Sequence, residues 1–154
     1  MEGETHVQSG DRVTQREEHA SNYPEILIVT ADIGLTRFLS EGLLPEGFWP
    51  SAVRSGLQAL EVFRLRTFDA VIVDASLSDL PVDAFVERLR QSYDVSGAEV
   101  RQTQNVRLLI VAGIPQELEP YDMAGIRPDA IFVAPFELSD LVDELRRLSA
   151  GSAD

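Results

Sequence analysis

Short apolar runs that alternate with helix-like patterns constrain the fold of this chain more than any other feature of its sequence. The runs cover residues 25–31, 70–73, 106–112 and 130–134, and a short edge strand is expected at about 51–54. Strands that are buried on both faces give near-continuous apolar runs, whereas strands with one solvated face alternate. The runs therefore predict a parallel sheet that helices cover on both sides.

Helical spacing of apolar residues marks the segments between these runs. The clearest pattern begins at Pro81, because proline is favoured in the first turn of a helix. Its apolar residues follow at i, i+3, i+4 and i+7: Val82, Phe85, Val86 and Leu89. Ser55 and Gln58 have the spacing of a capping box at an earlier helix start. The helix after Pro115 is expected to be irregular, because Pro120 follows too closely for a long regular helix.

Five strands and five helices in this order predict one flavodoxin-like, doubly wound α/β domain, a three-layer sandwich with strand order 2-1-3-4-5. The domain is expected to cover residues 25–148, between flexible tails at 1–24 and 149–154. Right-handed crossovers would place the carboxyl ends of strands one, three, four and five at one edge of the sheet. Open α/β sheets bind ligands at that edge, so the functional site is expected there.

Composition narrows the possible functions. The chain of 154 residues carries a net charge of −13, which would repel phosphates and argues against nucleic-acid binding. It has no cysteine, which excludes disulfides and thiol chemistry. No apolar run approaches the roughly 20 residues that a membrane span needs, and the N-terminus lacks the pattern of a signal peptide. We therefore expect a cytoplasmic protein that binds neither nucleic acid nor membrane.

Asp74 ends one of the apolar runs, where its carboxylate would face the ligand-binding edge. Together with the run 26–29, the segment 68–74 and the pair Pro135 and Phe136, it makes residues 25–148 resemble the receiver domain of bacterial two-component response regulators. The resemblance places Asp74 at the phosphoacceptor position of that family. It also implies neighbouring groups that this chain lacks, which indicates an atypical, or pseudo-receiver, variant.

Magnesium binding is the first property that the family's site would require. A divalent cation neutralises oxygens of the carboxylate and of the incoming phosphoryl group, and in the family two adjacent acids after the first strand hold it. Those positions are Thr30 and Ala31 here, and Asp32 follows one residue late, where we interpret it as the N-cap of the next helix. We therefore expect no metal or other cofactor. If Mg²⁺ does bind, Asp32 and Asp74 are its candidate ligands.

The other two helper groups of the family are also missing. Val111 replaces the hydroxyl residue at the end of the fourth strand, and Ala134 replaces the lysine before Pro135. Ser76 occupies the position whose backbone carbonyl would contact the metal. The unpaired negative charge of a phosphoryl group in this partly dehydrated rim would cost several kcal/mol. The depleted rim is expected to contain Thr30, Ala31, Asp32, Ser76, Val111 and Ala134.

Two further expectations concern carboxylates in and after the acceptor strand. Asp74 is expected to be a neutral acid, or an ionised carboxylate that accepts hydrogen bonds from loop amides and from the hydroxyls of Thr30 or Ser76. Asp79 and Asp83 lie at i and i+4 near a predicted helix start, where negative charge interacts favourably with the helix dipole.

The retained fold and the depleted site predict a stand-alone, non-enzymatic receiver domain in phosphorelay signalling that acts through phosphorylation-independent protein–protein contact. Its partner would be a histidine kinase or another signalling protein. The expected contact surface is the usual output face of receivers, which consists of the fourth helix, the fifth strand and the fifth helix. Two copies of the chain could also form a homodimer through this face. Two alternatives stay open. Either a histidine kinase phosphorylates Asp74, or the chain is a small-ligand sensor whose site includes Thr30, Val111 and Ala134.

Overall fold

Five parallel strands form the centre of the computed structural model, which describes residues 23–91 and 106–153. The strands lie in the order β2-β1-β3-β4-β5, which confirms the predicted doubly wound topology. β1, β3 and β4 are buried almost throughout, as their continuous apolar runs require. The strand bounds are Glu25–Val29 for β1, Trp49–Val53 for β2, Ala70–Asp74 for β3, Arg107–Ala112 for β4 and Ala130–Val133 for β5.

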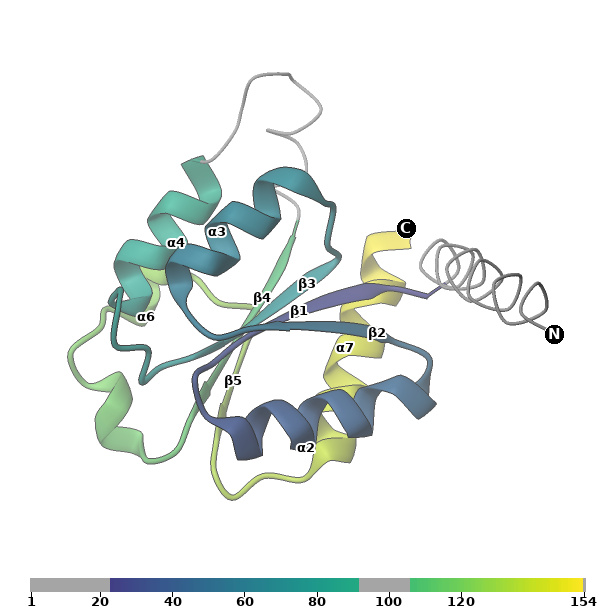
Figure 1. Ribbon diagram of the computed structural model, residues 1–154. Helices are drawn as coiled ribbons and strands as arrows, with labels where there is room; N and C mark the ends of the chain where they lie inside the picture. Colours follow the sequence, from purple (N-terminus) through teal and green to yellow (C-terminus); the bar gives the residue numbers. More distant parts are fainter. Residues whose placement is uncertain (1–22, 92–105, 154) are drawn as a thin grey trace, which may run out of the picture.

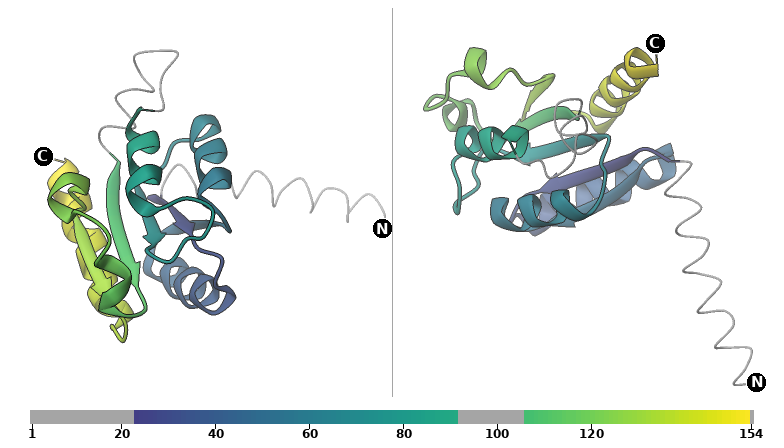
Figure 2. Two further views of the ribbon diagram at one scale, coloured as in Figure 1. Left: turned by 90° about the vertical axis from the view of Figure 1, so that its left-hand side faces the viewer. Right: turned by 90° about the horizontal axis from the view of Figure 1, so that it is seen from above.

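Helices cover both faces of the sheet and give the molecule three layers, as Figures 1 and 2 show. The main helices are α2 (Ile33–Leu43), α3 (Gly56–Leu65), α4 (Val82–Gln91) and α7 (Leu138–Ala153). One apolar cluster joins the sheet to α3 and α4 and includes the fully buried Phe85. A second cluster joins the opposite face to α2 and α7 through Leu39 and Leu141.

The starts of α2 and α3 follow the capping rules that the sequence predicted. Asp32 Oδ1 accepts a hydrogen bond from the backbone amide of Leu35 at 3.0 Å, which confirms Asp32 as the N-cap of α2. Ser55 Oγ accepts one from the amide of Gln58 at 3.1 Å, and Gln58 Oε1 accepts one from the amide of Arg54 at 2.9 Å. These bonds fix where each helix leaves the strand that precedes it.

The segment between β4 and β5 holds two short helical pieces in place of one regular helix. The 3-10 helix η2 covers Pro115–Leu118, and α6 covers Met123–Ile126. Pro120 lies between them, and a helix does not continue through a proline that lacks an amide hydrogen and crowds the preceding turn. The predicted irregularity of the fourth helix is confirmed.

Two boundaries differ from the predicted ones. β2 begins at Trp49, because the Trp49 amide donates to the carbonyl of Pro24 at 2.8 Å and opens the pairing with β1. α7 continues to Ala153, whereas a flexible tail was predicted from residue 149. Residues 149–153 contain no proline, so the backbone of a helix that has already formed can continue through them.

Other expectations on chain organisation fall outside the described residues. They concern most of the predicted N-terminal tail, up to residue 22, and the predicted loop at 92–105. In the described part of the chain, no helix combines the length and the apolar character that crossing a membrane requires.

Candidate functional site

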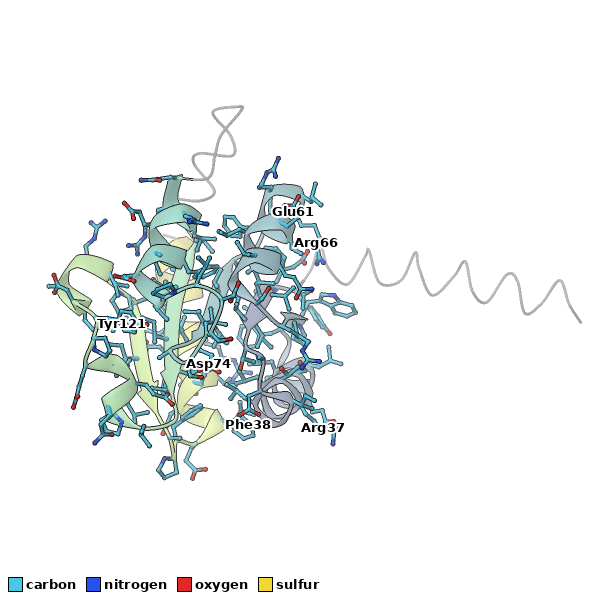
Figure 3. All side chains as sticks on the ribbon, turned by 60° about the vertical axis from the view of Figure 1, so that its left-hand side comes forward. Arg37, Phe38, Glu61, Arg66, Asp74 and Tyr121 are labelled. Atoms are coloured by element: carbon cyan, nitrogen blue, oxygen red, sulfur yellow. The ribbon has the colours of Figure 1, made fainter. Side chains whose placement is uncertain are left out.

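The carboxyl ends of β1, β3, β4 and β5 meet at one edge of the sheet, with Asp74 near its middle (Figure 3). β3 pairs with β1 on one side and with β4 on the other, and Asp74 stands opposite Val111. The strand order reverses at β1 and β3, and open α/β sheets hold ligands at such a switch point. Among the side chains described in the structure, Thr30 and Asp74 are the only buried polar ones, with exposures of 1% and 7%.

The Asp74 carboxylate accepts three hydrogen bonds, all from neutral donors. Thr30 Oγ1 donates to Oδ2 at 2.5 Å. Ser76 donates to Oδ1 twice, from its backbone amide at 2.8 Å and from its hydroxyl at 2.7 Å. The structure thus confirms the predicted hydroxyl and amide partners. A carboxylate offers about four lone-pair positions, so Asp74 keeps capacity for a further donor.

Thr30 and Asp32 link Asp74 to the start of α2 and do not form a metal site. Thr30 Oγ1 accepts a hydrogen bond from the Asp32 amide at 3.0 Å while it donates to Asp74. The Asp32 carboxylate turns to the Leu35 amide, and the side chain of Ala31 has no ligand atom. In residues 23–91 and 106–153, no three acidic, histidine or cysteine side chains form a group that could hold a metal ion. The residues present therefore do not fit the magnesium site that the resemblance implies.

The positions of the other two helper groups lack charge and hydrogen-bonding side chains. Val111 is buried at the end of β4, and Ala134 is exposed directly after β5. All 13 basic residues of the chain are arginines, so no lysine from another position can substitute for the missing one. The described residues that line the space around the Asp74 carboxylate include no arginine.

A hollow of about 190 Å³ lies beside Asp74. Four of the predicted rim residues line it together with Asp74, namely Asp32, Ser76, Val111 and Ala134. Thr30 is not part of the lining and contacts Asp74 from a buried position, and Ala31 is exposed outside the hollow. The apolar side of the lining includes Leu35, Ala112 and Phe136. The structure thus brings most of the predicted rim to one small cavity.

Glu117 is a site residue that sequence reasoning missed. Its Oε1 accepts a hydrogen bond from the amide of Gly113 at 2.7 Å, and both residues line the hollow. The contact closes the turn between β4 and η2 over the edge of the sheet. The sequence does contain a signal, because Glu117 follows four residues after Gly113, the glycine directly after the apolar run 106–112. Which amide Glu117 contacts depends on the shape of the turn.

Asp79 has a partner that differs from the predicted one. Its two carboxylate oxygens accept hydrogen bonds from the amides of Gly56 and Leu57, each at 2.9 Å, at the start of α3 and not of α4. Partial burial acts to raise the pKa of Asp79, but these amides and those of Asp79 and Leu80 outweigh it, so the pKa lies below its ordinary value of 3.8. Asp79 therefore ties the loop after Asp74 to α3. Asp83 lies in the first turn of α4, as predicted.

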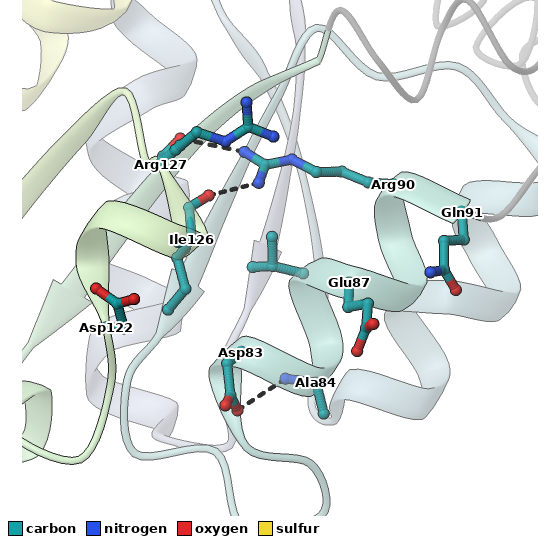
Figure 4. Close-up of a pocket in the computed structure, with 10 residues that line it drawn as sticks. Asp83, Ala84, Glu87, Arg90, Gln91, Asp122, Ile126 and Arg127 are labelled. Atoms are coloured by element: carbon teal, nitrogen blue, oxygen red, sulfur yellow. Dashed lines mark hydrogen bonds between the residues drawn. The ribbon is translucent and has the colours of Figure 1, made fainter.

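A second, larger hollow of about 470 Å³ lies between α4 and α6 (Figure 4). Arg90 reaches from α4 and donates to the backbone carbonyls of Ile126 and, at 3.1 Å, of Arg127. Burial lowers the pKa of Arg90, and the neighbouring charge of Arg127 lowers it further. The contact closes the end of α6, where Arg127 adopts a left-handed φ of 55°. None of the predicted rim residues lies here, and we assign Arg90 a structural role.

Comparison with solved structures finds receiver domains of two-component systems. The chemotaxis response regulator CheY4 of Vibrio cholerae has a TM-score of 0.66 and 20% identity, over 82% of this chain and 98% of that chain. A CheY-like receiver domain from Methylobacillus flagellatus has a TM-score of 0.67 and 25% identity, over 82% and 98%. The receiver domain of a Pseudomonas aeruginosa sensor histidine kinase, with magnesium coordinated in its active-site cleft, has a TM-score of 0.69 and 17% identity, over 82% and 97%.

No protein family model and no curated protein sequence matches the chain. The structural likenesses show a CheY-like fold. The CheY-like receiver domain of 25% identity supports a receiver domain of two-component signalling, in agreement with the resemblance in the sequence. Fold similarity does not transfer chemistry, because function depends on the atoms at the site. At the positions where the resemblance implies metal-binding acids, a hydroxyl and a lysine, this chain has Thr30, Ala31, Val111 and Ala134.

Proposed function

We propose that this chain is an atypical, non-enzymatic receiver domain that signals by binding a protein partner and not by accepting a phosphoryl group on Asp74. The observation that carries the proposal is the environment of the Asp74 carboxylate. Its hydrogen-bond donors are the neutral groups of Thr30 and Ser76, and the described residues around it offer neither a metal site nor a basic side chain. The fold supports the signalling class.

Electrostatics explain why this environment opposes phosphotransfer. A phosphoryl group on Asp74 would bring about −1.5 to −2 charges into a hollow whose lining residues already include the acidic Asp32 and Glu117. A receiver that uses magnesium and lysine cancels this charge with cations, which here have no counterpart in the lining. The net charge of −13 adds long-range repulsion for a phosphodonor.

The proposed contact surface consists of η2, α6, β5 and α7. Two apolar side chains are exposed on or beside it, Ile114 just before η2 at 52% and Ile131 in β5 at 38%. The divided helix between β4 and β5 gives this surface a different shape from one formed by a single regular helix. A histidine kinase or another signalling protein with a basic contact surface is the proposed partner, and a second copy of the chain could use the same face.

The experiment that tests the proposal is incubation of the full chain with acetyl phosphate and Mg²⁺, followed by intact-mass measurement. We expect no phosphoryl group on the wild-type chain, and the same mass spectrum for Asp74→Asn. A phosphorylated species in the wild type that is absent in Asp74→Asn would overturn phosphorylation independence.

The second candidate function is a phosphoacceptor in a relay, and the position of Asp74 at the end of β3 favours it. A protein donor could supply groups that the chain lacks, so acetyl phosphate alone does not test this candidate. Incubation with autophosphorylated histidine kinases, with the Asp74→Asn chain as control, does so. Transfer that depends on Asp74 would establish the relay.

The contact surface has its own matched test. Ile131→Glu should weaken partner binding or self-association, because it places a charge among the exposed apolar groups of the proposed face. Ile33→Glu is the control, since Ile33 is 63% exposed on α2, outside the proposed face. Equal loss in both variants would place the contact elsewhere.

A further inference from the structure

The outer edge of β5 offers backbone groups that no other described strand uses. β5 is the last strand of the sheet, and within the described residues it pairs with β4 alone. Its register with β4 is unbroken, and the amide of Ala134 donates to the carbonyl of Ala112 at 2.8 Å. Backbone groups of successive strand residues point alternately to the two sides, so those of Ile131 and Val133 point away from β4. The alternation starts with β5 itself, because Asp129 bonds to β4 through both its amide and its carboxylate.

The side chains of β5 leave this edge unprotected. Three of them pack into the apolar clusters on the two faces of the sheet: Ala130, Phe132 and Val133. Ile131 is in neither cluster and is 38% exposed. Edge strands usually carry a charge, a proline or a bulge that blocks pairing with another strand, and β5 contains no charged residue and no proline. An edge of this kind is a template for a further strand.

The opposite edge of the sheet, which β2 forms, is protected. The Trp49 amide and the Val53 carbonyl both form hydrogen bonds with the segment that contains β1. By the same alternation, the backbone groups that point outward from β2 belong to Pro50 and Ala52. Pro50 has no amide hydrogen to donate at that edge. The β2 edge therefore lacks a donor that a further strand would need, whereas both outward residues of β5 have one.

This difference between the edges favours one way of joining two copies of the chain. Pairing β5 of one copy with β2 of the next would continue without end and would leave a carbonyl opposite Pro50 without a donor. Antiparallel pairing of β5 with β5 of a second copy is isologous and stops at a dimer. With the two-fold axis at Phe132, Ile131 of each copy stands opposite Val133 of the other. Each such pair exchanges both of its backbone hydrogen bonds, so all outward groups of β5 are used.

The charges beside this edge also fit an antiparallel pair. Arg127 and Glu137 are exposed, and they lie five residues before and five residues after the position of the axis. On α7, Asp140 lies in the first turn, near the carboxyl end of β5. Arg147 interacts with the charge of Asp129 at the amino end, where the Asp129 carboxylate is turned to β4. An antiparallel arrangement brings the basic end of each copy to the acidic end of the other, whereas a parallel one would align like charges.

We propose that two copies of this chain associate through antiparallel pairing of their β5 strands, which joins the two sheets across a two-fold axis at Phe132. The inference rests on the contact surface proposed above, and it names the occupant of that surface and a main-chain mode of binding. Because β5 has four residues, the paired edge is short, so the dimer is weak and depends on protein concentration. The pairing requires no phosphoryl group.

The experiment is sedimentation equilibrium of the full chain at physiological ionic strength, where salt screens the repulsion between two chains of charge −13. We expect a monomer–dimer equilibrium within the range up to millimolar protein. Amide hydrogen exchange measured by NMR then locates the interface without any substitution. The amides of Ile131 and Val133 should exchange at least about tenfold more slowly at concentrations that favour the dimer, whereas the outward amide of Ala52 should not change. A chain that stays monomeric, or a dimer with unchanged exchange at Ile131 and Val133, would overturn the proposal.

Two matched proline substitutions test the pairing through its backbone groups. Ile131→Pro removes an outward amide that β4 does not use, and it should raise the dissociation constant of the dimer at least about tenfold. Ala52→Pro makes the same change at the outer edge of β2 and should leave that constant unchanged. Ile131→Val keeps the amide and should dimerise as the wild type does. Equal weakening in the two proline variants, or an unweakened dimer in Ile131→Pro, would contradict strand pairing.

The same measurements separate this inference from the proposed function. If Ile131→Glu disrupts the dimer and Ile131→Pro does not, the two copies associate through side chains, so the contact surface stands and strand pairing fails. Phosphorylation independence is decided by the acetyl phosphate experiment, which reads Asp74 on β3 and not the edge at β5.

Discussion

The interior of the sheet and the rim at its carboxyl end follow different rules in this molecule. Along β3, residues 70–73 are apolar and at most 2% exposed, and they need only fill space between two layers of helices. One residue later, Asp74 is buried among specific hydrogen-bond donors. Apolar volume is supplied by many residue types, whereas phosphoryl chemistry needs particular atoms. The comparison teaches that a receiver fold can be kept in full while its rim acquires another set of interactions.

The carboxylates around the rim share one structural use. Asp32, Asp79 and Glu117 all accept hydrogen bonds from backbone amides at the starts of helices or turns. The opposite end of the sheet has the same arrangement, because Asp69 and Asp129 accept from strand amides at 2.8 Å each. Asp74 is the exception, since two of its three donors are side-chain hydroxyls and it faces a cavity.

The largest loss of stability should come from a substitution in the apolar interior. Phe85→Ala removes a fully buried ring from the cluster between the sheet, α3 and α4, and should lower the free energy of unfolding by about 3 to 5 kcal/mol. Urea unfolding measures it. Phe38→Ala is the matched control, because Phe38 is 43% exposed and should lose much less. Equal losses in the two variants would mean that buried and exposed rings contribute equally to stability. That result would contradict a special role for the packed interior of the sheet.

Substitutions at the rim should lower the free energy of unfolding less than Phe85→Ala does, and the loss should depend on hydrogen bonds. Thr30→Val keeps the shape of the side chain but removes the donor to Asp74 and the acceptor for the Asp32 amide. We expect a loss of about 2 kcal/mol in the free energy of unfolding, since the buried carboxylate loses a charge-assisted bond. Thr30→Ser should recover most of it. A Thr30→Val chain as stable as the wild type would show that the Asp74 contact adds nothing to the fold.

The smallest loss of stability should come from removing the exposed hydrogen bonds between Asp79 and the start of α3. Asp79→Asn should cost about 1 kcal/mol at pH 7, as other helix-capping substitutions do. The folded pKa of Asp79 is depressed, so this contribution is present above its ordinary value of 3.8 and is lost as pH falls through the folded pKa. Unfolding curves of wild type and Asp79→Asn should therefore converge in acid. Asp83→Asn is the control, because the Asp83 carboxylate accepts a hydrogen bond from the amide of Ala84 and does not reach α3 in the described part of the chain.

Most of the fold and part of the site could be predicted from the sequence. Sheet order follows from apolar runs and the handedness of crossovers, which act through every residue of the core. Asp32 as a cap and the partners of Asp74 were predictable because the groups involved lie close along the chain or at adjacent strand ends. The missing helper groups could be identified by position alone.

The rest depends on contacts that local patterns do not encode. Asp79 bonds to amides 22 and 23 residues earlier, because the turn after β3 brings it to the start of α3 and not of its own helix. Glu117 bonds within a turn whose shape depends on η2. The hollow of about 190 Å³ is lined by residues of β3 and β4 and of the segments that follow β1, β3, β4 and β5, so no single segment predicts it.

The most direct test of the central claim is to restore the rim and compare phosphorylation. Wild type, a restored variant and the restored variant carrying Asp74→Asn are incubated with acetyl phosphate and Mg²⁺ and weighed by intact mass. The account predicts an unmodified wild type and one phosphoryl group on the restored variant that disappears with Asp74→Asn. A wild type that is phosphorylated on Asp74 to the same extent as the restored variant would contradict it. The restoring substitutions are Thr30→Asp, Ala31→Asp, Val111→Thr and Ala134→Lys.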